Sequence, residues 1–325
     1  MKAMILAAGF GERLWPLTAD RTKPALPVLG KPLVGYVAEY LARSGITEVV
    51  VNLHHEPDSV RRALGDGRQF GVRLEYVYEP EILGTSGALD NARSLLDSET
   101  FVVINGKLVT DIDLKSALQH HRQQNALATL VLQRNVARER FSIVETRDGL
   151  VTRFAGMPSP ADSNTEPPLM FTGIHIMEPR IFDYIPRGIF SDTVVDAYPK
   201  AMAVGERIVA HVGEGSWYEL STLQRYLQIS LALLHDQHRD FYTGANPHID
   251  ANADVSQSVL WDDVVVAAGA RVRRAVIGDR VRLKQGQVVE DAVVVRADLI
   301  AGKKAPAKAL KGELIGDNFV VPLSQ

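Results

Sequence analysis

At 325 residues, with 46% hydrophobic and 23% charged side chains, the chain has the size and composition of a globular protein of about two domains. Its net charge of -3 provides no general basic surface, so we expect no nucleic-acid partner. The absence of cysteine excludes disulfides, thiolate catalysis and cysteine-bound zinc. No apolar stretch reaches the roughly 18 residues of a membrane span, and the first apolar run is too short for a signal peptide. We therefore expect a cytoplasmic protein without a membrane partner.

Strand and helix patterns alternate over the first two-thirds of the chain. The expected strands are 2–7, 46–53, 72–78, 100–104, 126–133 and 171–176, and the expected helices are 33–44, 58–64, 86–96, 114–124 and 223–238. This order predicts an α/β fold with a Rossmann-like, mostly parallel sheet and helices on both faces. Because such sheets bind ligands at the carboxyl ends of their strands, the loops after Ala7, Leu53, Tyr78 and Ile104 should share one rim.

The loop after the first strand has a composition that suits phosphate binding. Gly9 and Gly11 lack a Cβ, so backbone N–H groups there can approach an anion closely. Arg13 offers a planar fork of donors for phosphate oxygens, and Lys23 offers a mobile positive charge. The two glycines alone are equally consistent with an ordinary strand-to-helix turn, since short glycine patterns are weak evidence.

The sequence changes character near residues 243–247, which predicts a domain boundary between residues 243 and 244. Residues 1–243 would form the α/β domain and residues 244–325 a repeat domain. Branched residues recur there at or near multiples of six, at Ile249, Val255, Val266, Val272 and Val293. This period predicts a parallel β-helix with corners at Gly269, Gly278 and Gly286 and an interruption at 260–263. A small sandwich of β-hairpins is the alternative.

The opening segment resembles the signature of the sugar-nucleotide pyrophosphorylases, and most closely their mannose-1-phosphate guanylyltransferase-like branch. The matching residues are Leu6–Gly9, Gly11, Arg13–Leu14, Pro16–Thr18, Lys23–Pro24 and Pro27–Pro32. The resemblance extends over nearly the whole chain. It implies that the protein joins a nucleoside triphosphate to a sugar 1-phosphate and releases pyrophosphate, with Mg²⁺ as cofactor. GTP with mannose 1-phosphate is the first expectation and UTP the second.

The same resemblance implies a C-terminal left-handed parallel β-helix, through which several relatives assemble, and so a homo-oligomer. It gives Arg13 and Lys23 catalytic roles. The residues expected to bind nucleotide are Leu6, Ala8, Gly9, Gly11, Gly84, Thr85, Ser86, Gly87, Asn105 and Gly106. Taken alone, 84–88 is simply a helix start in which Thr85 or Ser86 is the cap. Gly173 and Glu145 are expected to face the sugar, although Glu145 is equally consistent with a solvated strand position.

The sequence departs from the pattern of that family at Lys107, at 156–158 and, more conservatively, at Glu219. Lys107 stands where relatives have a magnesium-binding Asp, and an ammonium group cannot coordinate a cation. The segment 156–158 lacks the lysine that relatives direct to the sugar phosphate. Glu219 replaces an Asp that binds metal in relatives, and its carboxylate can still coordinate. Lys107 could itself neutralise the triphosphate, the chain could be a nucleotide-sugar-binding regulatory protein without turnover, or position 107 could carry an introduced substitution.

Overall fold

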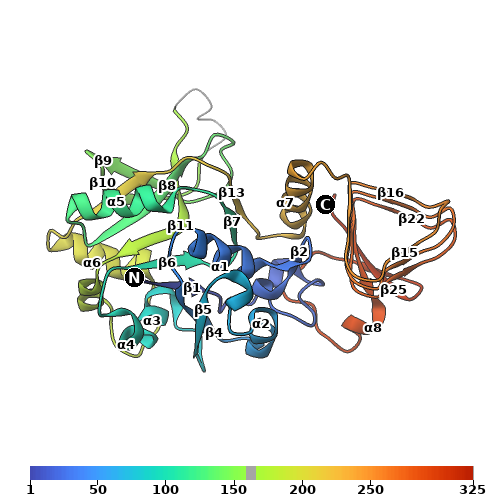
Figure 1. Ribbon diagram of the computed structural model, residues 1–325, viewed down its shortest axis with the longest axis horizontal. Coiled ribbons are helices and arrows are strands. Elements are labelled where there is room, and N and C mark those ends of the chain that lie inside the picture. The colour runs from blue at the N-terminus through green and yellow to red at the C-terminus, as the bar shows by residue number, and fades with distance from the viewer. Residues whose placement is uncertain (159–165, 325) are drawn as a thin grey trace. The chain divides into compact units, whose positions relative to one another are not determined.

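The computed structural model describes residues 1–158 and 166–324, which form two compact units (Figure 1). The units do not follow the order of the chain. The first consists of Met1–Ala8, Val34–Pro57 and Leu64–Trp217, and the second consists of Gly9–Leu33, Asp58–Ala63 and Tyr218–Gln325. The glycine-containing loop and its flanks thus belong to the same compact unit as the C-terminal repeat. The sequence-based boundary between residues 243 and 244 stays a prediction.

The first unit is built on one nine-stranded sheet in the order β5-β4-β1-β6-β11-β8-β12-β10-β9. Its strands are β1 (Lys2–Leu6), β4 (Glu48–Leu53), β5 (Arg73–Tyr78), β6 (Phe101–Asn105), β8 (Ala128–Arg134), β9 (Ile143–Arg147), β10 (Leu150–Ala155), β11 (Leu169–Met177) and β12 (Ile208–Val212). The four strands β5, β4, β1 and β6 are mutually parallel. β11 then runs antiparallel to both β6 and β8, so the sheet is parallel in one half and mixed in the other.

Among the described residues before β13, six α-helices occur, and five of them begin or end within two residues of a predicted bound. They are α1 (Leu33–Arg43), α2 (Pro57–Leu64), α3 (Gly84–Asn91), α4 (Arg93–Leu96), α5 (Leu114–Gln124) and α6 (Tyr198–Ala203). The predicted helix at 86–96 is two helices divided at Ala92. α5 begins where the Asp113 carboxylate accepts from the N–H groups of Lys115 and Ser116, as an N-cap does.

One face of the sheet is covered by α3 and α6 through a continuous hydrophobic core. Met4 and Val103 from the parallel strands pack in one buried cluster with Leu89 from α3 and Tyr198 from α6. Each of these side chains is at most 1% exposed. Burial of this kind contributes about 1.5–3 kcal/mol per large apolar side chain, so the core fixes the strands whose ends carry the predicted site.

The second unit begins with the segment 9–33, which contains two short 3₁₀ turns and a two-stranded hairpin. These are η1 (Glu12–Leu14), η2 (Lys23–Ala25), β2 (Pro27–Val28) and β3 (Lys31–Pro32). β13 (Trp217–Glu219) leads into α7 (Leu223–Asp236), which starts where Thr222 Oγ1 accepts from the N–H of Arg225. α7 replaces the predicted helix 223–238 and ends two residues earlier.

The C-terminal repeat is a three-sided parallel β-helix whose turns are 17 residues long, as the equivalent hydrogen-bonded residues show. The sides follow the sets β14-β17-β20-β23, β15-β18-β21 and β16-β19-β22. The strands are β14 (Tyr242–Thr243), β15 (His248–Ile249), β16 (Asp254–Ser256), β17 (Val259–Leu260), β18 (Val265–Val266), β19 (Arg271–Arg273), β20 (Val276–Ile277), β21 (Arg282–Leu283), β22 (Val288–Glu290) and β23 (Ala292–Arg296). Successive sides begin at residues 242, 248, 254 and 259. Two sides of each turn therefore take the expected six residues, and the third takes one residue fewer.

Stacked residues with positive φ turn the corners of the β-helix. Asn246, Asp263 and Arg280 occupy equivalent places in successive turns, with φ of 49°, 57° and 58°. Gly269 and Gly286, both predicted corners, each have a φ of 69°, whereas Gly278 is not among the glycines with positive φ. The predicted interruption at 260–263 is wrong, because these residues form a regular corner of the coil. Buried side chains such as Leu260, Val272 and Val294 fill its interior.

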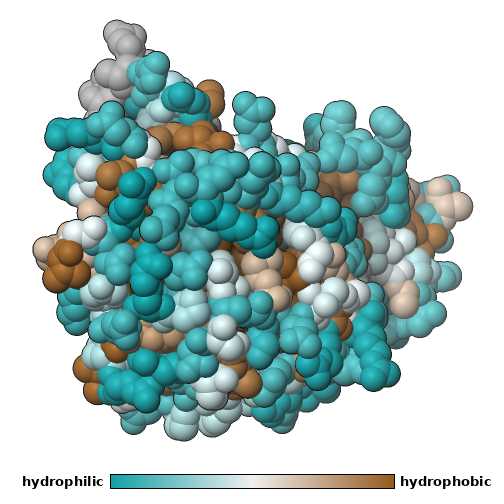
Figure 2. Space-filling model, turned by 60° about the vertical axis from the view of Figure 1, so that its left-hand side comes forward, coloured by the Kyte–Doolittle hydropathy of each residue, from teal (hydrophilic) through white to brown (hydrophobic). Residues whose placement is uncertain are grey.

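The chain closes the repeat with three further elements. α8 (Ala297–Ile300) follows β23, and β25 (Asn318–Pro322) returns antiparallel to β23 and pairs with β24 (Glu313–Ile315). The face of the molecule in Figure 2 is mostly hydrophilic, with small separate hydrophobic patches. Among the described residues, no helix is long and apolar enough to cross a membrane.

Candidate active site

The carboxyl ends of β1 and β6 bring four of the predicted ligand-binding residues together. Leu6 lies beside Asn105 in the parallel register, and the N–H of Gly106 donates to the carbonyl of Leu6 at 2.9 Å. A Cβ on Gly106 would lie 2.9 Å from that carbonyl oxygen, and one on Gly173 would lie 2.2 Å from Asn105 Nδ2. Only glycine therefore allows the turn after β6 and the strand β11 to approach this closely. Ala8, half-buried, ends the same stretch of the first unit.

A buried hydrogen-bond network joins the ends of β1, β4 and β5. Asn52 Oδ1 accepts from the N–H of Ala7 at 2.7 Å, and Asn52 Nδ2 donates to Glu79 Oε1 at 2.7 Å. Glu79 Oε2 in turn accepts from the N–H of Leu83 at 3.2 Å. Burial raises the pKa of the Glu79 carboxyl, and the hydrogen bonds from Asn52 and Leu83 partly oppose that rise. The network ties the strand ends to Leu83, the N-cap of α3.

The first turn of α3, residues 84–87, packs against residues 189–193. The N–H groups of Ser86 and Gly87 donate to the carbonyl of Ser191 at 3.1 and 3.2 Å, and Thr85 Oγ1 donates to Asp192 Oδ2 at 3.0 Å. A Cβ on Gly84 would lie 2.4 Å from the carbonyl oxygen of Ser191. The helix start that the sequence allowed at 84–88 is confirmed, because α3 begins at Gly84. The expected cap is wrong, since the N-cap is Leu83 and neither Thr85 nor Ser86 caps the helix.

The glycine-containing loop of the second unit folds directly against Lys23. Gly11 has a φ of 69°, and its carbonyl accepts from the N–H of Leu14 at 2.9 Å, which closes the turn η1. A Cβ on Gly11 would lie 2.8 Å from Lys23 Cβ, whereas no protein atom lies within 4 Å of one on Gly9. Leu14 is 1% exposed while Arg13 stays on the surface. The loop thus combines Lys23, an exposed guanidinium and open space over Gly9, an arrangement suited to an anion.

The residues at the expected metal position do not form a metal site by themselves. Lys107 is half-buried directly after Gly106, and its ammonium group repels a cation. Glu219 is half-buried on β13 and is the single carboxylate predicted as a ligand. Within the ranges 1–158 and 166–324, no group of three or more His, Asp or Glu side chains could hold a metal ion. The fit to a protein-bound Mg²⁺ is therefore poor.

Glu145 forms an ion pair across the strands β9 and β10. Its carboxylate accepts from Arg153 Nη2 at 2.5 Å and from Arg153 Nε at 3.0 Å. This bidentate pair holds the pKa of Glu145 below its usual value. Glu145 is 44% exposed, which also matches the solvated strand position that the sequence left open.

The predicted site residues divide between the two compact units. Leu6, Ala8, Gly84, Thr85, Ser86, Gly87, Asn105, Gly106, Lys107, Glu145 and Gly173 belong to the first unit, and Gly9, Gly11, Arg13, Lys23 and Glu219 belong to the second. In the first unit the end of β6 gathers Leu6, Asn105, Gly106 and Gly173. In the second unit Gly11 and Lys23 lie in contact.

Sequence reasoning missed Asn52 and Glu79, which shape the first unit's rim. Asn52 is 3% exposed and Glu79 is 1% exposed, although both are polar. Each lies at the end of a largely apolar strand, and that placement was the available signal: a buried polar side chain needs a partner. Asp192 was missed as well, and its sequence neighbourhood offers no comparable pattern.

Comparison with known proteins identifies related sequences along most of the chain. Residues 2–236 match the nucleotidyl transferase family, and residues 242–298 match the GlmU-like C-terminal hexapeptide family. A UTP–glucose-1-phosphate uridylyltransferase from Synechocystis is 29% identical over 90% of this chain and 82% of its own length. A mannose-1-phosphate guanylyltransferase from Mycobacterium tuberculosis is 28% identical over 92% of this chain and 82% of its own length.

A shorter relative and a crystal structure extend this comparison. An N-acetylmuramate α-1-phosphate uridylyltransferase from Neisseria meningitidis is 35% identical over 69% of this chain and 95% of its own length. A Bacillus anthracis structure described as a glucose-1-phosphate thymidylyltransferase in complex with sucrose has a TM-score of 0.63 and 25% identity. It covers 73% of this chain and 96% of that protein. The chain belongs to the sugar-1-phosphate nucleotidyltransferase family and carries a C-terminal hexapeptide-type β-helix.

Proposed function

We propose that the protein transfers a nucleotidyl group from GTP to mannose 1-phosphate, with UTP as the second choice of nucleotide. The supporting observation is the glycine-containing loop of the second unit, in which Gly11 contacts Lys23 and Arg13 is exposed. Relatives of similar identity are named for guanylyl, uridylyl and thymidylyl transfer, so the family alone leaves the base open. The choice of GTP rests on the mannose-1-phosphate guanylyltransferase-like character of the sequence.

In the proposed reaction an oxygen of the sugar phosphate attacks the α-phosphorus of the nucleotide, and pyrophosphate leaves with the electrons of the broken P–O bond. No protein nucleophile is needed, so catalysis consists of positioning and charge neutralisation. Arg13 and the backbone at Gly9 and Gly11 hold the β- and γ-phosphates. Lys23 stabilises the charge that builds on the α-phosphoryl group.

The remaining predicted contacts belong to the first unit. Gly84–Gly87 bounds the base, with Leu6, Ala8, Asn105 and Gly106 along the nucleotide. Gly173 borders the sugar, and Glu145 contributes there only if its ion pair with Arg153 opens. Members of this family typically use Mg²⁺. Since the described residues fit a protein-held ion poorly, we propose that Mg²⁺ arrives on the triphosphate, with Glu219 as its one candidate protein ligand.

A panel of four nucleoside triphosphates against several sugar 1-phosphates, with pyrophosphate release as the readout, tests the proposed activity. We expect release that requires both substrates and is fastest with GTP and mannose 1-phosphate. Mass spectrometry of the nucleotide sugar identifies the product. Release that is fastest with another pair would overturn the substrate assignment and leave the reaction type standing.

Two departures from the family pattern favour a second function, a regulatory protein that binds nucleotide sugars without turning them over. Lys107 removes the family's expected metal-binding carboxylate, and the residues 156–158 lack the expected lysine. On this alternative, calorimetry detects binding of GDP-mannose while every substrate pair in the panel releases no pyrophosphate.

We also propose that the protein works in the cytoplasm and that it assembles as a homo-oligomer through the β-helix. The edge strand β24 exposes Leu314 and Ile315, which are 67% and 46% exposed. Unpaired edges with apolar side chains favour self-association. Light scattering should give at least twice the chain mass of 35.7 kDa, and a mass of one chain would contradict this.

A further inference from the structure

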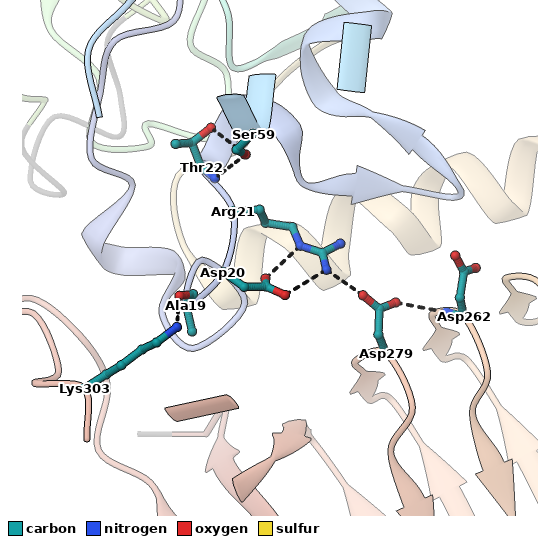
Figure 3. A network of polar contacts seen from close by, with 8 residues as sticks. All are labelled: Ala19, Asp20, Arg21, Thr22, Ser59, Asp262, Asp279 and Lys303. Carbon is teal, nitrogen blue, oxygen red and sulfur yellow. Dashed lines mark hydrogen bonds and ion pairs between the residues drawn. The ribbon is translucent and has the colours of Figure 1, made fainter. Parts of the chain in front are cut away.

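Arg21, two residues before Lys23, is held by a corner of the β-helix (Figure 3). Arg21 Nη2 donates to Asp279 Oδ2 at 2.6 Å, and Arg21 Nε donates to Asp20 Oδ1 at 2.9 Å. The guanidinium carbon also lies 5.0 Å from the ring centre of Trp261. The side chains of Arg21 and Asp279 are only 25% and 24% exposed, so water screens this pair less than a surface ion pair.

The carboxylate of Asp279 is itself fixed by the coil. Its Oδ1 accepts from the N–H of Asp262 at 3.1 Å, one turn of 17 residues earlier. Asp262 makes the equivalent bond to the preceding turn, where its Oδ1 accepts from the N–H of Ala245 at 2.7 Å. Asp279 therefore uses one oxygen to complete the aspartate stack of this corner and the other to hold Arg21.

The same corner also reaches the chain on the other side of Lys23. Trp261 Nε1 donates to the hydroxyl of Tyr226 at 2.9 Å, and that hydroxyl donates to the carbonyl of Pro27. Between the two anchors, the N–H of Thr22 donates to Ser59 Oγ at 2.9 Å. Hydrogen bonds therefore hold the segment that carries Lys23 at Arg21 and Thr22, before Lys23, and at Pro27, after it.

Electrostatic attraction stabilises the contacts that Arg21 makes with Asp20 and Asp279, which we call the Arg21 clasp. Burial works against a charged guanidinium, but the hydrogen bonds and charges of Asp20 and Asp279 outweigh it and raise the pKa of Arg21 further. At the start of the same segment, Lys303 Nζ donates to the carbonyl of Ala19. The segment therefore contacts a negatively charged residue of the β-helix, Asp279, and a positively charged residue of its C-terminal extension, Lys303.

We propose that Trp261 and Asp279 of the β-helix, acting through Arg21, are positioning residues that fix Lys23 for nucleotidyl transfer. The inference rests on the function proposed above, because it concerns how well Lys23 meets the α-phosphoryl group. Displacing a catalytic group by about 1 Å costs up to roughly 10²-fold in rate, so a loosened loop should be measurable. The repeat domain then contributes to the catalytic step from outside the substrate contacts.

The first test compares Asp279→Asn with the matched control Asp262→Asn, using GTP and mannose 1-phosphate. Both changes keep the size of the side chain and the oxygen that accepts from the coil, but only the first removes the charge that holds Arg21. We expect Asp279→Asn to lower kcat about tenfold with little change in the KM for mannose 1-phosphate, and Asp262→Asn to match the wild type. Equal rates for all three proteins would overturn the proposal.

A second background separates positioning from general damage. In a Lys23→Ala protein, Asp279→Asn should cause no further loss, because its effect passes through Lys23. A tenfold loss in both backgrounds would overturn the proposal. Arg21→Gln should reproduce the loss from the other partner, and the double variant Arg21→Gln/Asp279→Asn should be no slower than either single variant.

A turnover-independent readout keeps the clasp testable if the proposed activity fails. Lys23 can be acetylated with a small amine-reactive reagent and its rate of labelling followed by peptide mass spectrometry. We expect severalfold faster labelling of Lys23 in Asp279→Asn than in the wild type or Asp262→Asn. Unchanged labelling would overturn the clasp, whereas a wild type that releases no pyrophosphate would overturn the proposed function alone.

Discussion

The two compact units place their shares of the predicted site by different means. In the first unit, parallel strands end side by side. Close glycine contacts and the Asn52–Glu79 hydrogen bonds, all between neighbouring strand ends, hold the predicted residues in place. In the second unit, the loop carrying Arg13 and Lys23 is fixed by the β-helix, with Arg21 and Asp279 separated by 258 positions. A contiguous sequence signature can therefore owe its shape to the far end of the chain.

The largest expected effect comes from Lys23 in the second unit. Lys23→Ala should lower kcat about 10³-fold, because a charge that stabilises the transition state is lost. The exposed Lys304 of the same unit serves as control, and Lys304→Ala should retain the wild-type rate. The measurement is initial pyrophosphate release at saturating GTP and mannose 1-phosphate. A kcat for Lys23→Ala within a factor of two of the wild type would remove the catalytic assignment.

The next effect concerns Lys107, where the first unit departs from the family. Lys107→Asp restores the expected carboxylate, so we expect the rate to rise by about 10² and to depend strictly on magnesium. Initial rates against Mg²⁺ concentration for both proteins provide the measurement. A lower rate in the Asp variant would show that Lys107 itself neutralises the triphosphate.

Gly173 tests the close approach at the end of β6. Gly173→Ala should lower the free energy of unfolding by about 3 kcal/mol, since it combines a positive φ with overlap of Asn105. Gly149 has a φ of 75° and nothing within 4 Å of its Cβ, so Gly149→Ala carries the backbone cost alone. That control should lose about 1 kcal/mol in urea unfolding. Equal losses would mean that Asn105 moves aside freely.

The smallest effect is expected at the buried network. Glu79→Gln should reduce the free energy of unfolding by about 1 kcal/mol, because an amide cannot accept from both Asn52 and Leu83 in their present geometry. Glu75 is an exposed residue of β5, the strand that Glu79 follows, and Glu75→Gln should change stability by less than about 0.5 kcal/mol. Indistinguishable urea midpoints for the two variants would show that the network does not stabilise the fold.

Much of the architecture follows from local patterns in the sequence. The alternating elements predicted the parallel half of the sheet, and α5 has the predicted bounds at Leu114 and Gln124. The antiparallel course of β11 was not predictable, because nothing local to residues 169–177 encodes the direction of its neighbours. The six-residue period indicated the coil but missed its shorter side, which lies between the corners at Gly269 and Arg274 and again between those at Gly286 and Asp291.

The arrangement of the candidate site was predictable where a motif carries it and unpredictable where long-range contacts do. Gly11 and Lys23 were identified from the signature, and the structure brings them into contact, while their roles stay a prediction. Asn52 and Glu79 needed knowledge that three strand ends are neighbours. Arg21 and Asp279 needed the register of the coil, since a lone Arg or Asp in a loop has many solvated alternatives.

The central claim, that an oxygen of the sugar phosphate attacks the α-phosphorus of the nucleotide, is tested most directly by isotope transfer. Mannose 1-phosphate carrying ¹⁸O in its non-bridging phosphate oxygens is incubated with GTP, and both products are analysed by mass spectrometry. We predict GDP-mannose that retains all of the label, together with unlabelled pyrophosphate. Binding of both substrates without any nucleotide sugar, or label appearing in pyrophosphate, would contradict the account.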